Sequence, residues 1–330
     1  MLILGIAFLK IMSKQSLTFI LTVLISVISG CNTTSLDNTR GFIDINDISR
    51  ILDTNKLTLN YSLSNENKEY FISALLKEEY EFGIEFNKNG KKLNDDLLDS
   101  TLSFFCNSYI EDQRSKLNSS LYKEINDQEE ILVIYSEKFI TQADKLKEDN
   151  PNSKFYFLSN KINHEDFALT VIGVDSSIKR FNDLQKNDTS IAIKHSPREK
   201  KDFKKIYFLI EYNIGKSLVP IFRSYLIDTE FYSTIEILLG ASSIKELNDF
   251  ENIIIPVPAY FFDNLSSKII IDNLKNELNQ DLVEDLILAE SIHQYNFYGK
   301  NVRFKSGMAK VSRGQCIERE LSMVKVSLNS

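Results

Sequence analysis

Glycine and histidine are both scarce in this 330-residue sequence, which has 11 glycines and 3 histidines. The glycines form neither a GxGxxG fingerprint nor a Walker loop, so backbone cradling of a phosphate has no basis in the sequence. His164, His195 and His293 show no HExxH spacing, no cysteine pair stands in metal-ligand register, and GxSxG is absent. We therefore predict no catalytic, cofactor-binding or metal-binding residue, and we expect the protein not to be an enzyme.

An excess of basic charge is also missing. The chain has 39 Lys and Arg against 46 Asp and Glu, a formal net charge of −7. A surface of this sign argues against nucleic acid as a partner. Adjacent acids such as Glu78-Glu79 point in different directions on a helix or strand and are normally solvated, so they do not indicate general acid–base catalysis.

The first thirty residues have the pattern of a targeting signal. Lys14 precedes an uncharged apolar segment at 17–28. A transmembrane helix needs about 20 apolar residues, whereas a signal segment needs about 7–15 followed by small residues. The small residues directly before Cys31 resemble a bacterial lipobox. We predict a lipoprotein signal peptide over 1–30 with lipidation at Cys31; an ordinary signal peptide with a chance cysteine is the alternative.

Acylation at Cys31 would attach the protein to a membrane by lipid, without spanning it. Asn32 follows the cysteine, and in the bacterial sorting pattern that this resembles, the absence of aspartate there favours the outer membrane. We predict a lipid-anchored protein on the periplasmic side of the outer membrane, with 31–55 as a lipidated tether. The apolar stretch before Lys14 suggests that translation starts at Met12, with Met1 as the alternative.

Cys106 and Cys316 are the cysteines left once Cys31 is assigned to the lipid. An oxidising compartment permits them to pair, and the chain-entropy model gives such a long loop a stabilisation of about 5 kcal/mol. Cysteine is also among the most buried residue types, so two buried free thiols are an equal alternative. The sequence gives no distance between the two residues, and both interpretations stay open.

Strand and helix patterns alternate along the body of the chain. Residues 131–136 form a near-continuous apolar run, as a strand covered on both faces requires. Helical spacing follows over 139–147, a Pro-Asn-Ser break ends it, and 154–158 is a second strand candidate. These segments predict a βαβ unit and an α/β fold with parallel sheets.

The alternation continues towards the C-terminus. Pro220 stands inside one predicted helix, where its missing N–H should cause a kink. Two alternating runs joined through Gly314 predict a terminal hairpin. The predicted helices are 177–184, 214–226, 268–278 and 282–294, the predicted strands are 205–210, 234–238 and 252–255, and the hairpin arms are 302–310 and 316–326.

Three large aromatic side chains, Tyr260, Phe261 and Phe262, follow a Pro-Val-Pro turn at the end of a predicted strand. In α/β folds, ligands and partners meet the loops at the carboxyl ends of strands, so these residues are candidates for a partner contact. Most large aromatics pack inward, and we favour the alternative that the three cover a core.

Five motifs occur in an order that resembles one protein family. The first, Phe-Ile-Ser-Ala-Leu-Leu-Lys at 71–77, resembles an early Gly-Pro-Leu-Leu-Lys segment. The second, Ile-Glu-Asp-Gln at 110–113, resembles a Pro-Glu-Asp-Glu turn that opens a helix. The third, Gly-Val-Asp-Ser at 173–176 with Arg180 a turn later, resembles Gly-Val-Asp-x-Ser-x-x-Arg.

Two further motifs lie in the C-terminal half. Pro-Arg at 197–198 and Asp202, followed by a strand and by Leu-Val-Pro-Ile at 218–221, resemble the block Pro-Arg-x-x-x-Asp…Ile-Lys-Pro-Leu. Ser-Gly at 306–307 and Ile-Glu-Arg-Glu-Leu at 317–321 resemble a closing Ser-Gly…Ile-x-Arg-Glu-Leu. Together the five resemble the C-terminal domain of the LppC/LpoA family, lipoproteins that activate penicillin-binding proteins.

The resemblance implies a two-lobed α/β domain of the type I periplasmic-binding-protein kind, with a cleft between the lobes. It places an LppC-like domain at 56–330, with lobe one at about 56–125 and lobe two mainly at 126–330. Lobe one is shortened, because 32–68 is too short for its complete first strand–helix unit. The helical-repeat N-terminal domain of the larger members has no counterpart.

The same resemblance implies a non-enzymatic protein that regulates peptidoglycan synthesis by contacting a class A penicillin-binding protein. One alternative is a solute-binding lipoprotein of the branched-chain amino-acid type, which needs an intact cleft with backbone amides and hydroxyls. The shortened first lobe counts against it, so we do not expect a small ligand. Another alternative is a surface or host-facing lipoprotein that kept only the scaffold, because fold does not fix function.

Overall fold

The computed structural model describes residues 43–44, 56–77, 83–94, 96–123, 130–187, 196, 203–266 and 273–327. All of these belong to one compact unit, Phe42–Ser330. The predicted signal peptide, the predicted lipidation site Cys31 and most of the predicted tether lie outside the described residues.

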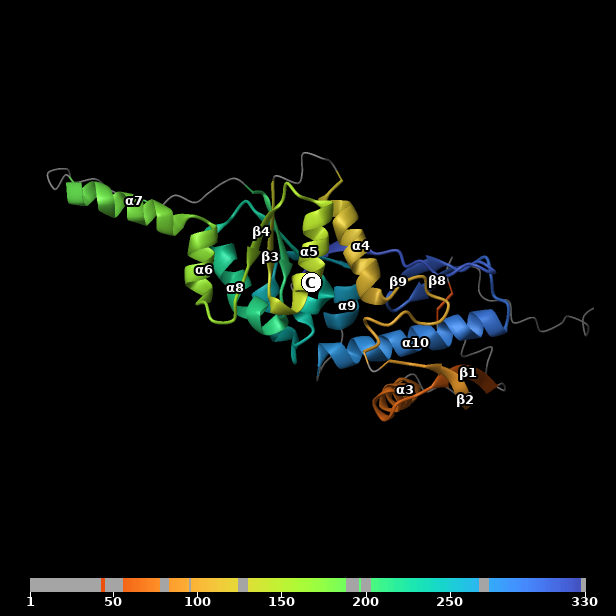
Figure 1. Ribbon diagram of the computed structural model, residues 1–330. Helices are drawn as coiled ribbons and strands as arrows, with labels where there is room; N and C mark the ends of the chain where they lie inside the picture. The colour runs from red at the N-terminus through yellow and green to blue at the C-terminus, as the bar shows by residue number, and fades with distance from the viewer. Residues whose placement is uncertain are drawn as a thin grey trace, which may run out of the picture. The chain divides into compact units, whose positions relative to one another are not determined.

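A six-stranded sheet organises the middle of the chain (Figure 1). The strand order is β10-β7-β6-β5-β3-β4, and every neighbouring pair is parallel except β10 and β7. The predicted α/β fold with parallel strands is therefore confirmed, including its first βαβ unit. The strands are β3 (Ile131–Tyr135), β4 (Lys154–Phe157), β5 (Lys205–Leu209), β6 (Glu230–Ser233), β7 (Ile253–Val257) and β10 (Ser322–Lys325).

Helices cover both faces of this sheet. The connection from β3 to β4 runs in one direction along the sheet, and the connections from β4 to β5 and from β5 to β6 run in the other. Because such connections are right-handed, their helices lie on opposite faces of the sheet. One face carries α4 (Tyr109–Leu121) and α5 (Ile140–Asp149), and the other carries α6 (His164–Val171) and α8 (Tyr212–Tyr225), which contact each other. The helix α8 runs on through Pro220.

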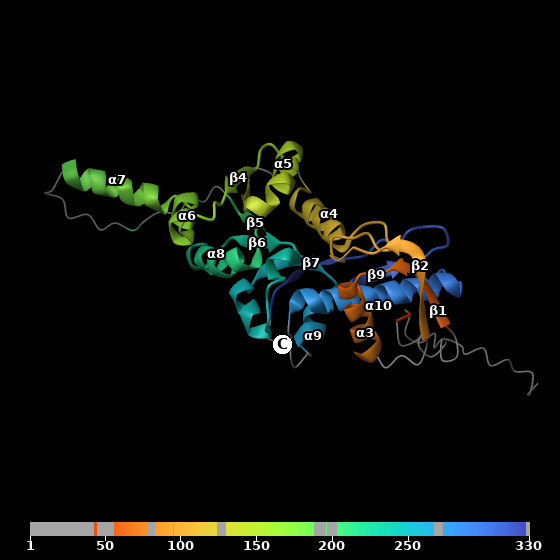
Figure 2. The same cartoon turned by 60° about the horizontal axis from the view of Figure 1, so that its bottom comes forward.

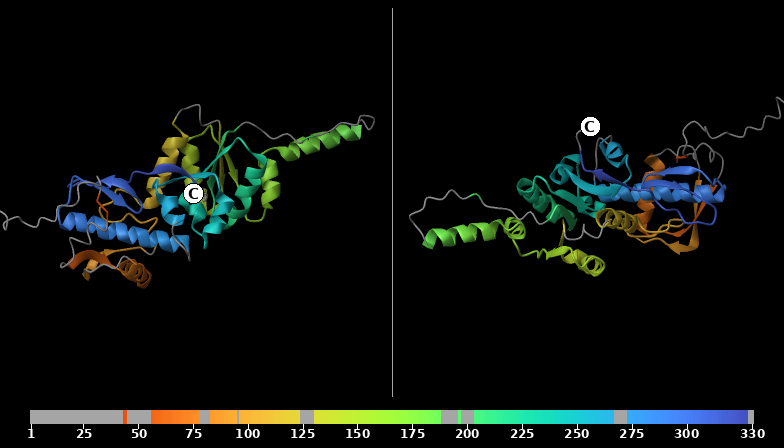
Figure 3. Two further views of the ribbon diagram at one scale, coloured as in Figure 1. Left: turned by 180° about the vertical axis from the view of Figure 1, so that it is seen from behind. Right: turned by 90° about the horizontal axis from the view of Figure 1, so that it is seen from above.

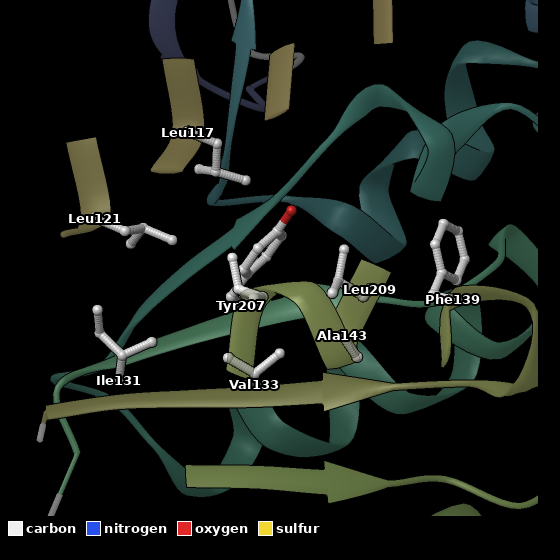
Figure 4. Packing of buried hydrophobic residues seen from close by; sticks show 9 residues of the cluster. Leu117, Leu121, Ile131, Val133, Phe139, Ala143, Tyr207 and Leu209 are labelled. Carbon is white, nitrogen blue, oxygen red and sulfur yellow. The ribbon is translucent and has the colours of Figure 1, made fainter. Parts of the chain in front are cut away.

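The core on the first face is drawn in Figure 4. Leu117 and Leu121 of α4 pack with Ile131 and Val133 of β3, and Tyr207 of β5 adds its ring to the same cluster. Residues 131–134 are all buried, because helices lie on both sides of this strand. This double burial explains why the run is continuously apolar rather than alternating.

The start of α4 is fixed by a capping box. The Ser108 hydroxyl accepts a hydrogen bond from the Glu111 N–H at 3.2 Å, and the Glu111 carboxylate accepts one from the Ser108 N–H at 2.9 Å. Both exchanges satisfy backbone donors that the helix itself leaves unpaired. The motif at 110–113 therefore opens a helix, as its resemblance implied.

A second βαβ unit lies before this region. It consists of the parallel strands β1 (Lys56–Ser62) and β2 (Gly83–Lys92) and the helix α3 (Asn65–Lys77). The helix α10 (Leu274–Gln294) packs along α3 and β1 (Figure 2). Two short strands, β8 (Asn301–Phe304) and β9 (Gly307–Lys310), form an antiparallel pair next to α10.

The division into lobes at about residue 125 stays a prediction, but some elements contact parts of the fold that lie across that boundary. The helix α4, assigned to the predicted lobe one, packs on the six-stranded sheet. Conversely, α10, from the predicted lobe two, contacts α3 and β1, and β8 contacts α10. Position along the chain did not reveal this, because the contacts that assign a helix to a sheet join residues far apart in sequence.

Three element predictions are also corrected. The predicted strand 234–238 is a 3₁₀ helix, Ile235–Leu238, and the strand precedes it as β6. The predicted helix 282–294 and the described end of the predicted helix 268–278 form one helix, α10, because the polar residues between them continue the turn; residues 268–272 lie outside the described residues. The predicted hairpin forms only in part: Met308 and Glu320 of the two runs make one antiparallel bridge, while β8 pairs with β9 and β10 pairs with β7.

The other short elements complete the description. The predicted helix 177–184 is confirmed as part of α7, and the predicted strand 252–255 is confirmed as part of β7. The elements not yet placed are the 3₁₀ helices Glu137–Phe139 and Ile244–Phe250, and the helices α7 (Val174–Asn187) and α9 (Phe261–Ser266).

Candidate functional site

A cleft of about 380 Å³ opens at the carboxyl ends of β5 and β6. Ligands in open α/β sheets bind at this edge, so the cleft is the first place to look for chemistry. Glu211 and Tyr212 begin α8 directly after β5, and Glu236 follows β6. Asp96, from the loop after β2, and Lys275, from the first turn of α10, also line the cleft.

The carboxylate of Glu236 is held inside the wall of this cleft. Its side chain is only 6% exposed, and its Oε2 atom lies 2.9 Å from Nη2 of Arg114 on α4. The hydroxyl of Thr234 donates to the same oxygen at 3.0 Å. Next to it, the amide oxygen of Gln113 accepts from the Ile235 N–H at 2.9 Å. This carboxylate therefore ties α4 to the sheet.

The carboxylate of Glu211 accepts a hydrogen bond from the hydroxyl of Ser136, a buried residue at the end of β3. A nucleophilic serine needs a base that can take its proton, most often a histidine. The hydroxyl that His164 contacts is that of Ser217, at 2.5 Å, and His293 stacks on the ring of Phe104, 3.7 Å away. Neither contact builds a serine–histidine pair at the cleft.

The cleft carries more acidic than basic groups. Asp96, Asp99, Glu211 and Glu236 line it, against two lysines, one of which is Lys275. The ammonium of Lys275 lies 3.0 Å from the Asp96 carboxylate, with both side chains partly exposed. This balance disfavours an anionic ligand. Among the described residues, no group of three or more His, Cys, Asp or Glu side chains is arranged to hold a metal ion.

Glycine shapes one end of the cleft. A Cβ atom at Gly240 would lie 2.3 Å from Cδ1 of Tyr212, closer than two carbon atoms can approach. The ring of Tyr212 therefore packs directly over this glycine, with the ring of Phe250 5.6 Å away. Below it, the Ser242 N–H and hydroxyl bind the carboxylate of Glu246, and these hydrogen bonds lower the pKa of Glu246 to about 2.

A second buried cluster joins the motifs at 110–113, 306–307 and 317–321. The guanidinium of Arg319 donates through Nη1 to the Asp112 carboxylate at 2.7 Å and through Nε to the Ser306 hydroxyl at 2.8 Å. It also lies over the ring of Phe105, 3.9 Å from the centroid. We call Asp112, Ser306 and Arg319 the joint cluster. It connects the start of α4 with the segments before and after β9.

Asp285 of α10 contacts the backbone of Ser306, a residue of the joint cluster. Its carboxylate accepts from the backbone N–H groups of Lys305 and Ser306, at 2.5 and 2.8 Å. Burial raises the pKa of Asp285 to about 6, while these hydrogen bonds act in the opposite direction. The residue thus holds the turn between β8 and β9 in place, and its role is structural.

Cys106 and Cys316 are joined in a disulfide beside the joint cluster, with their Cα atoms 5.0 Å apart. The backbone around them pairs as well: the Cys106 N–H donates to the Ile317 carbonyl at 3.0 Å, and the Ile317 N–H to the Phe104 carbonyl at 2.6 Å. Of the two interpretations that the sequence left open, the structure contains the disulfide.

Two of the three aromatic residues after β7 are buried. Phe261 and Phe262 are 7% and 6% exposed, with their rings 5.1 Å apart at nearly a right angle, as the inward-packing alternative expects. Their burial follows the inward packing favoured for large aromatics. Tyr260 is half-buried: its hydroxyl donates to the Phe304 carbonyl, and Arg303 lies 4.1 Å from its ring centroid.

Tyr260 lines a separate hollow of about 280 Å³ together with Arg303, Met308 and Glu320. Burial raises the pKa of the Tyr260 hydroxyl to about 12, so it remains protonated. A larger groove of about 430 Å³ lies between α4 and α5, above the buried ring of Tyr207. Polar and apolar side chains both line the hollow at Tyr260, the groove between α4 and α5, and the cleft.

Sequence reasoning missed the charged residues of the cleft. Arg114 and Glu236 are 122 positions apart, and Asp96 and Lys275 are 179 apart, so no local spacing links them. One signal was available: Glu211 and Glu236 each stand just after a strand, where side chains of a parallel sheet reach its functional edge. In the described chain, no helix is both long and apolar enough to cross a bilayer.

No protein-family profile matches the sequence, and no curated protein matches it either. Among solved structures, full-length LpoA from Haemophilus influenzae matches with a TM-score of 0.40 and 10% identity, over 88% of this chain and 52% of that one. The C-domain of the same protein, described as a regulator of PBP1A, matches with a TM-score of 0.38 and 11% identity, over 88% of each chain.

A leucine-binding protein, LivK from Thermotoga maritima, matches with a TM-score of 0.37 and 11% identity, over 85% of this chain and 80% of that one. The chain spans about half the length of the full-length LpoA chains that it matches. TM-scores this low do not decide between a regulator and a binding protein.

Proposed function

We propose that this chain is a lipid-anchored, non-enzymatic regulator that faces the periplasm from the outer membrane and stimulates a class A penicillin-binding protein by direct contact. The observation that carries the proposal is the order of the five motifs along the sequence. Three of them come together in space, since the Asp112–Arg319 pair and the Arg319–Ser306 hydrogen bond join residues of 110–113, 306–307 and 317–321.

This convergence strengthens the resemblance. Short motifs matched one at a time arise easily by chance, whereas motifs that build one buried cluster are constrained together. Arg319 is fully buried at its side chain and Asp112 is 10% exposed, so both residues serve the fold. The motifs therefore support a shared scaffold, and the contact with the partner is carried by other residues.

The lipid anchor is supported by the lipobox-like residues before Cys31. Regulation without catalysis is supported by the absence of nucleophile, phosphate-loop and metal-ligand motifs in the sequence. Two carboxylates of the cleft also support it, because they bind other side chains of the protein: Glu236 forms an ion pair with Arg114, and Glu211 accepts a hydrogen bond from Ser136.

The test uses the full-length lipoprotein, purified in detergent from the native organism, and the class A penicillin-binding proteins of that organism reconstituted in vesicles. We expect one of these enzymes to synthesise cross-linked glycan several-fold faster when the lipoprotein is added at a molar excess. Arg319→Met, which we expect to unfold readily, serves as an inactive control. An unchanged rate with every class A enzyme, at a lipoprotein concentration that saturates any binding, would refute the proposal.

Solute binding is the second candidate, because the cleft volume of about 380 Å³ falls in the range of small-molecule sites. A ligand present at 100 times its Kd adds about 2.7 kcal/mol of stability, which thermal unfolding detects. We expect leucine, isoleucine and valine at 10 mM to leave Tm unchanged. A rise of several degrees with one of them, together with no effect on any penicillin-binding protein, would favour the solute-binding function instead.

A further inference from the structure

The groove of about 430 Å³ between α4 and α5 has polar walls and a floor that belongs to the buried core. The two helices lie side by side on the same face of the sheet (Figures 1 and 3). The walls are Asn107, Glu111, Arg114, Ser115 and Asn118 on the side of α4 and Gln142, Lys145 and Asp149 on α5, and the floor is Leu146, Tyr207 and Leu209.

Three side chains of these walls each carry a polar atom that has no partner in the described part of the chain. The atoms are Nε of Arg114, Oδ1 of Asn118 and Oε1 of Gln142, and all three are shielded from solvent. Buried polar atoms are nearly always hydrogen-bonded, so each exception needs an explanation. Because the three exceptions come from both walls of one groove, a single occupant explains them together. The last torsion of an amide side chain is soft, so both amides can turn to meet that occupant.

The hydroxyl of Tyr207 is a fourth group of this kind. Tyr207 lies on β5, lines the groove and is only 2% exposed. Its hydroxyl points away from Val133 of β3 (Figure 4), and among the described residues no group forms a hydrogen bond with it. Burial raises the pKa of Tyr207, so the hydroxyl keeps its proton and can donate a hydrogen bond. A buried hydroxyl without a partner costs stability, and phenylalanine would suit the core better if nothing entered the groove.

We propose that this groove binds a neutral saccharide of two or three sugar units. The occupant must donate hydrogen bonds to the amide oxygens of Asn118 and Gln142. It must also accept hydrogen bonds from Arg114 Nε and from the Tyr207 hydroxyl. Sugar hydroxyls do both, because each has one donor and two acceptor positions. The proposal goes beyond the function proposed above and does not depend on it.

The lining selects against a charged ligand and against a peptide. Two acids, Glu111 and Asp149, stand against two bases, Arg114 and Lys145, so the groove favours neither an anion nor a cation. The apolar residues of the lining are confined to the buried floor, where they can meet the C–H face of a sugar ring. An apolar peptide side chain would need an apolar pocket in a wall, and both walls are polar.

The length and the rigidity of the groove fit a short oligosaccharide. Glu111 and Asn118 on α4, like Gln142 and Asp149 on α5, lie two turns apart, about 10 Å along the helix axis. Two sugar rings span this length. Arg114 is already held in place, because its Nη2 atom lies 2.9 Å from the Glu236 carboxylate. A donor that is fixed before binding loses little entropy when the ligand arrives.

Isothermal titration calorimetry of the full-length lipoprotein with neutral trisaccharides tests the proposal. The protein is kept in a polyoxyethylene detergent, because glucoside and maltoside detergents would themselves present sugars. The probes are maltotriose, cellotriose, laminaritriose and tri-N-acetylchitotriose, each up to 10 mM. We expect at least one of them to bind with a Kd on the order of 0.1–1 mM.

Two variants locate the binding in the groove. Tyr207→Phe and Gln142→Leu should each weaken it about five-fold or more, because each removes one hydrogen-bonding group. Tyr225→Phe is the matched control: it makes the same change on α8, which covers the other face of the sheet, and should leave the affinity unchanged. Because the Tyr207 hydroxyl has no partner in the described chain, Tyr207→Phe should keep or raise Tm, which separates loss of binding from loss of the fold.

Three results would overturn the proposal. If none of the four trisaccharides binds at 10 mM, ordered water fills the groove. If a trisaccharide binds and Tyr207→Phe leaves its affinity unchanged, the sugar binds elsewhere on the protein. Trialanine is the peptide probe: if it binds, if Tyr207→Phe weakens that binding, and if no trisaccharide binds, the groove takes a peptide instead.

Discussion

Arg319 donates through Nη1 to the carboxylate of Asp112 over 2.7 Å, although the two residues are 207 positions apart in the sequence. The Arg319 side chain has no exposed surface, and that of Asp112 is 10% exposed. The same guanidinium also binds the Ser306 hydroxyl and the Asn107 carbonyl. One arginine therefore holds the start of α4, the β8–β9 turn and the C-terminal segment together.

Replacing Arg319 with methionine should destabilise the protein strongly. Methionine keeps much of the length of the side chain but leaves the Asp112 carboxylate buried without its cation, a change that typically costs about 3–5 kcal/mol. We expect urea unfolding at pH 7.5 to show a loss of this size in the free energy of unfolding.

The double variant Asp112→Leu/Arg319→Met is the matched control. It removes both charges, so it should be more stable than Arg319→Met alone. A loss below 1 kcal/mol in the single variant would show that Asp112 finds water there, and that the pair does not hold the joint cluster together.

The disulfide should act on the unfolded chain. Cys106 and Cys316 are 210 positions apart, and closing so long a loop lowers the entropy of the unfolded state by an amount equivalent to about 5 kcal/mol at 25 °C. We expect Cys106→Ser/Cys316→Ser to unfold at a much lower urea concentration than the unmodified protein. Titration of the protein prepared without reductant should find no thiol from this pair. Two thiol equivalents would contradict the disulfide.

The central βαβ unit could be predicted because its signals are local. Residues 131–136 form a near-continuous apolar run without alternation, the pattern of a strand covered on both faces. The run at 234–238 misled for a physical reason. Its apolar residues resemble a strand, but the chain turns there into a 3₁₀ helix, where Glu236 meets Arg114 from α4 and Ile235 meets Gln113.

The candidate site was harder to predict, because its charged side chains come from five separate segments. Asp96, Lys138, Glu211, Glu236 and Lys275 lie far apart in the sequence and meet only in the folded chain. The polar residues that the motifs singled out proved to be structural, as Arg319 and Asp112 show. The sequence left open whether the aromatic residues after β7 are exposed or buried. Phe261 and Phe262 are buried, because α9 directs them into the core.

Phe262 offers a direct test of that burial. Its side chain is 6% exposed and stands edge to face with Phe261, so Phe262→Ala should cost about 3–4 kcal/mol through lost burial and a residual cavity. Ile227→Ala is the control, because Ile227 is 90% exposed and its loss should change stability by less than about 0.5 kcal/mol. Equal effects of the two substitutions on urea unfolding would contradict the placement of Phe262.

Two buried acids of α10 make the stability depend on pH. Burial raises the pKa of Asp285 from 3.8 to about 6 and that of Glu290 from 4.5 to about 7. Between each pair of values the folded state binds more protons than the unfolded state, so stability falls as pH rises through this window. The contribution is fully present below about pH 4 and is lost above about pH 7.

Replacing Glu290 with glutamine removes one of these two titrations while keeping the shape of the side chain. At pH 8 the native carboxylate is charged in a desolvated position, so Glu290→Gln should raise Tm by about 2–4 °C. At pH 5 the native carboxyl is protonated in the folded state, so the gain in Tm should be smaller there than at pH 8. Thermal unfolding at pH 5, 6, 7 and 8 checks this, and a Tm gain for Glu290→Gln that is the same at every pH would mean that Glu290 does not titrate in this range.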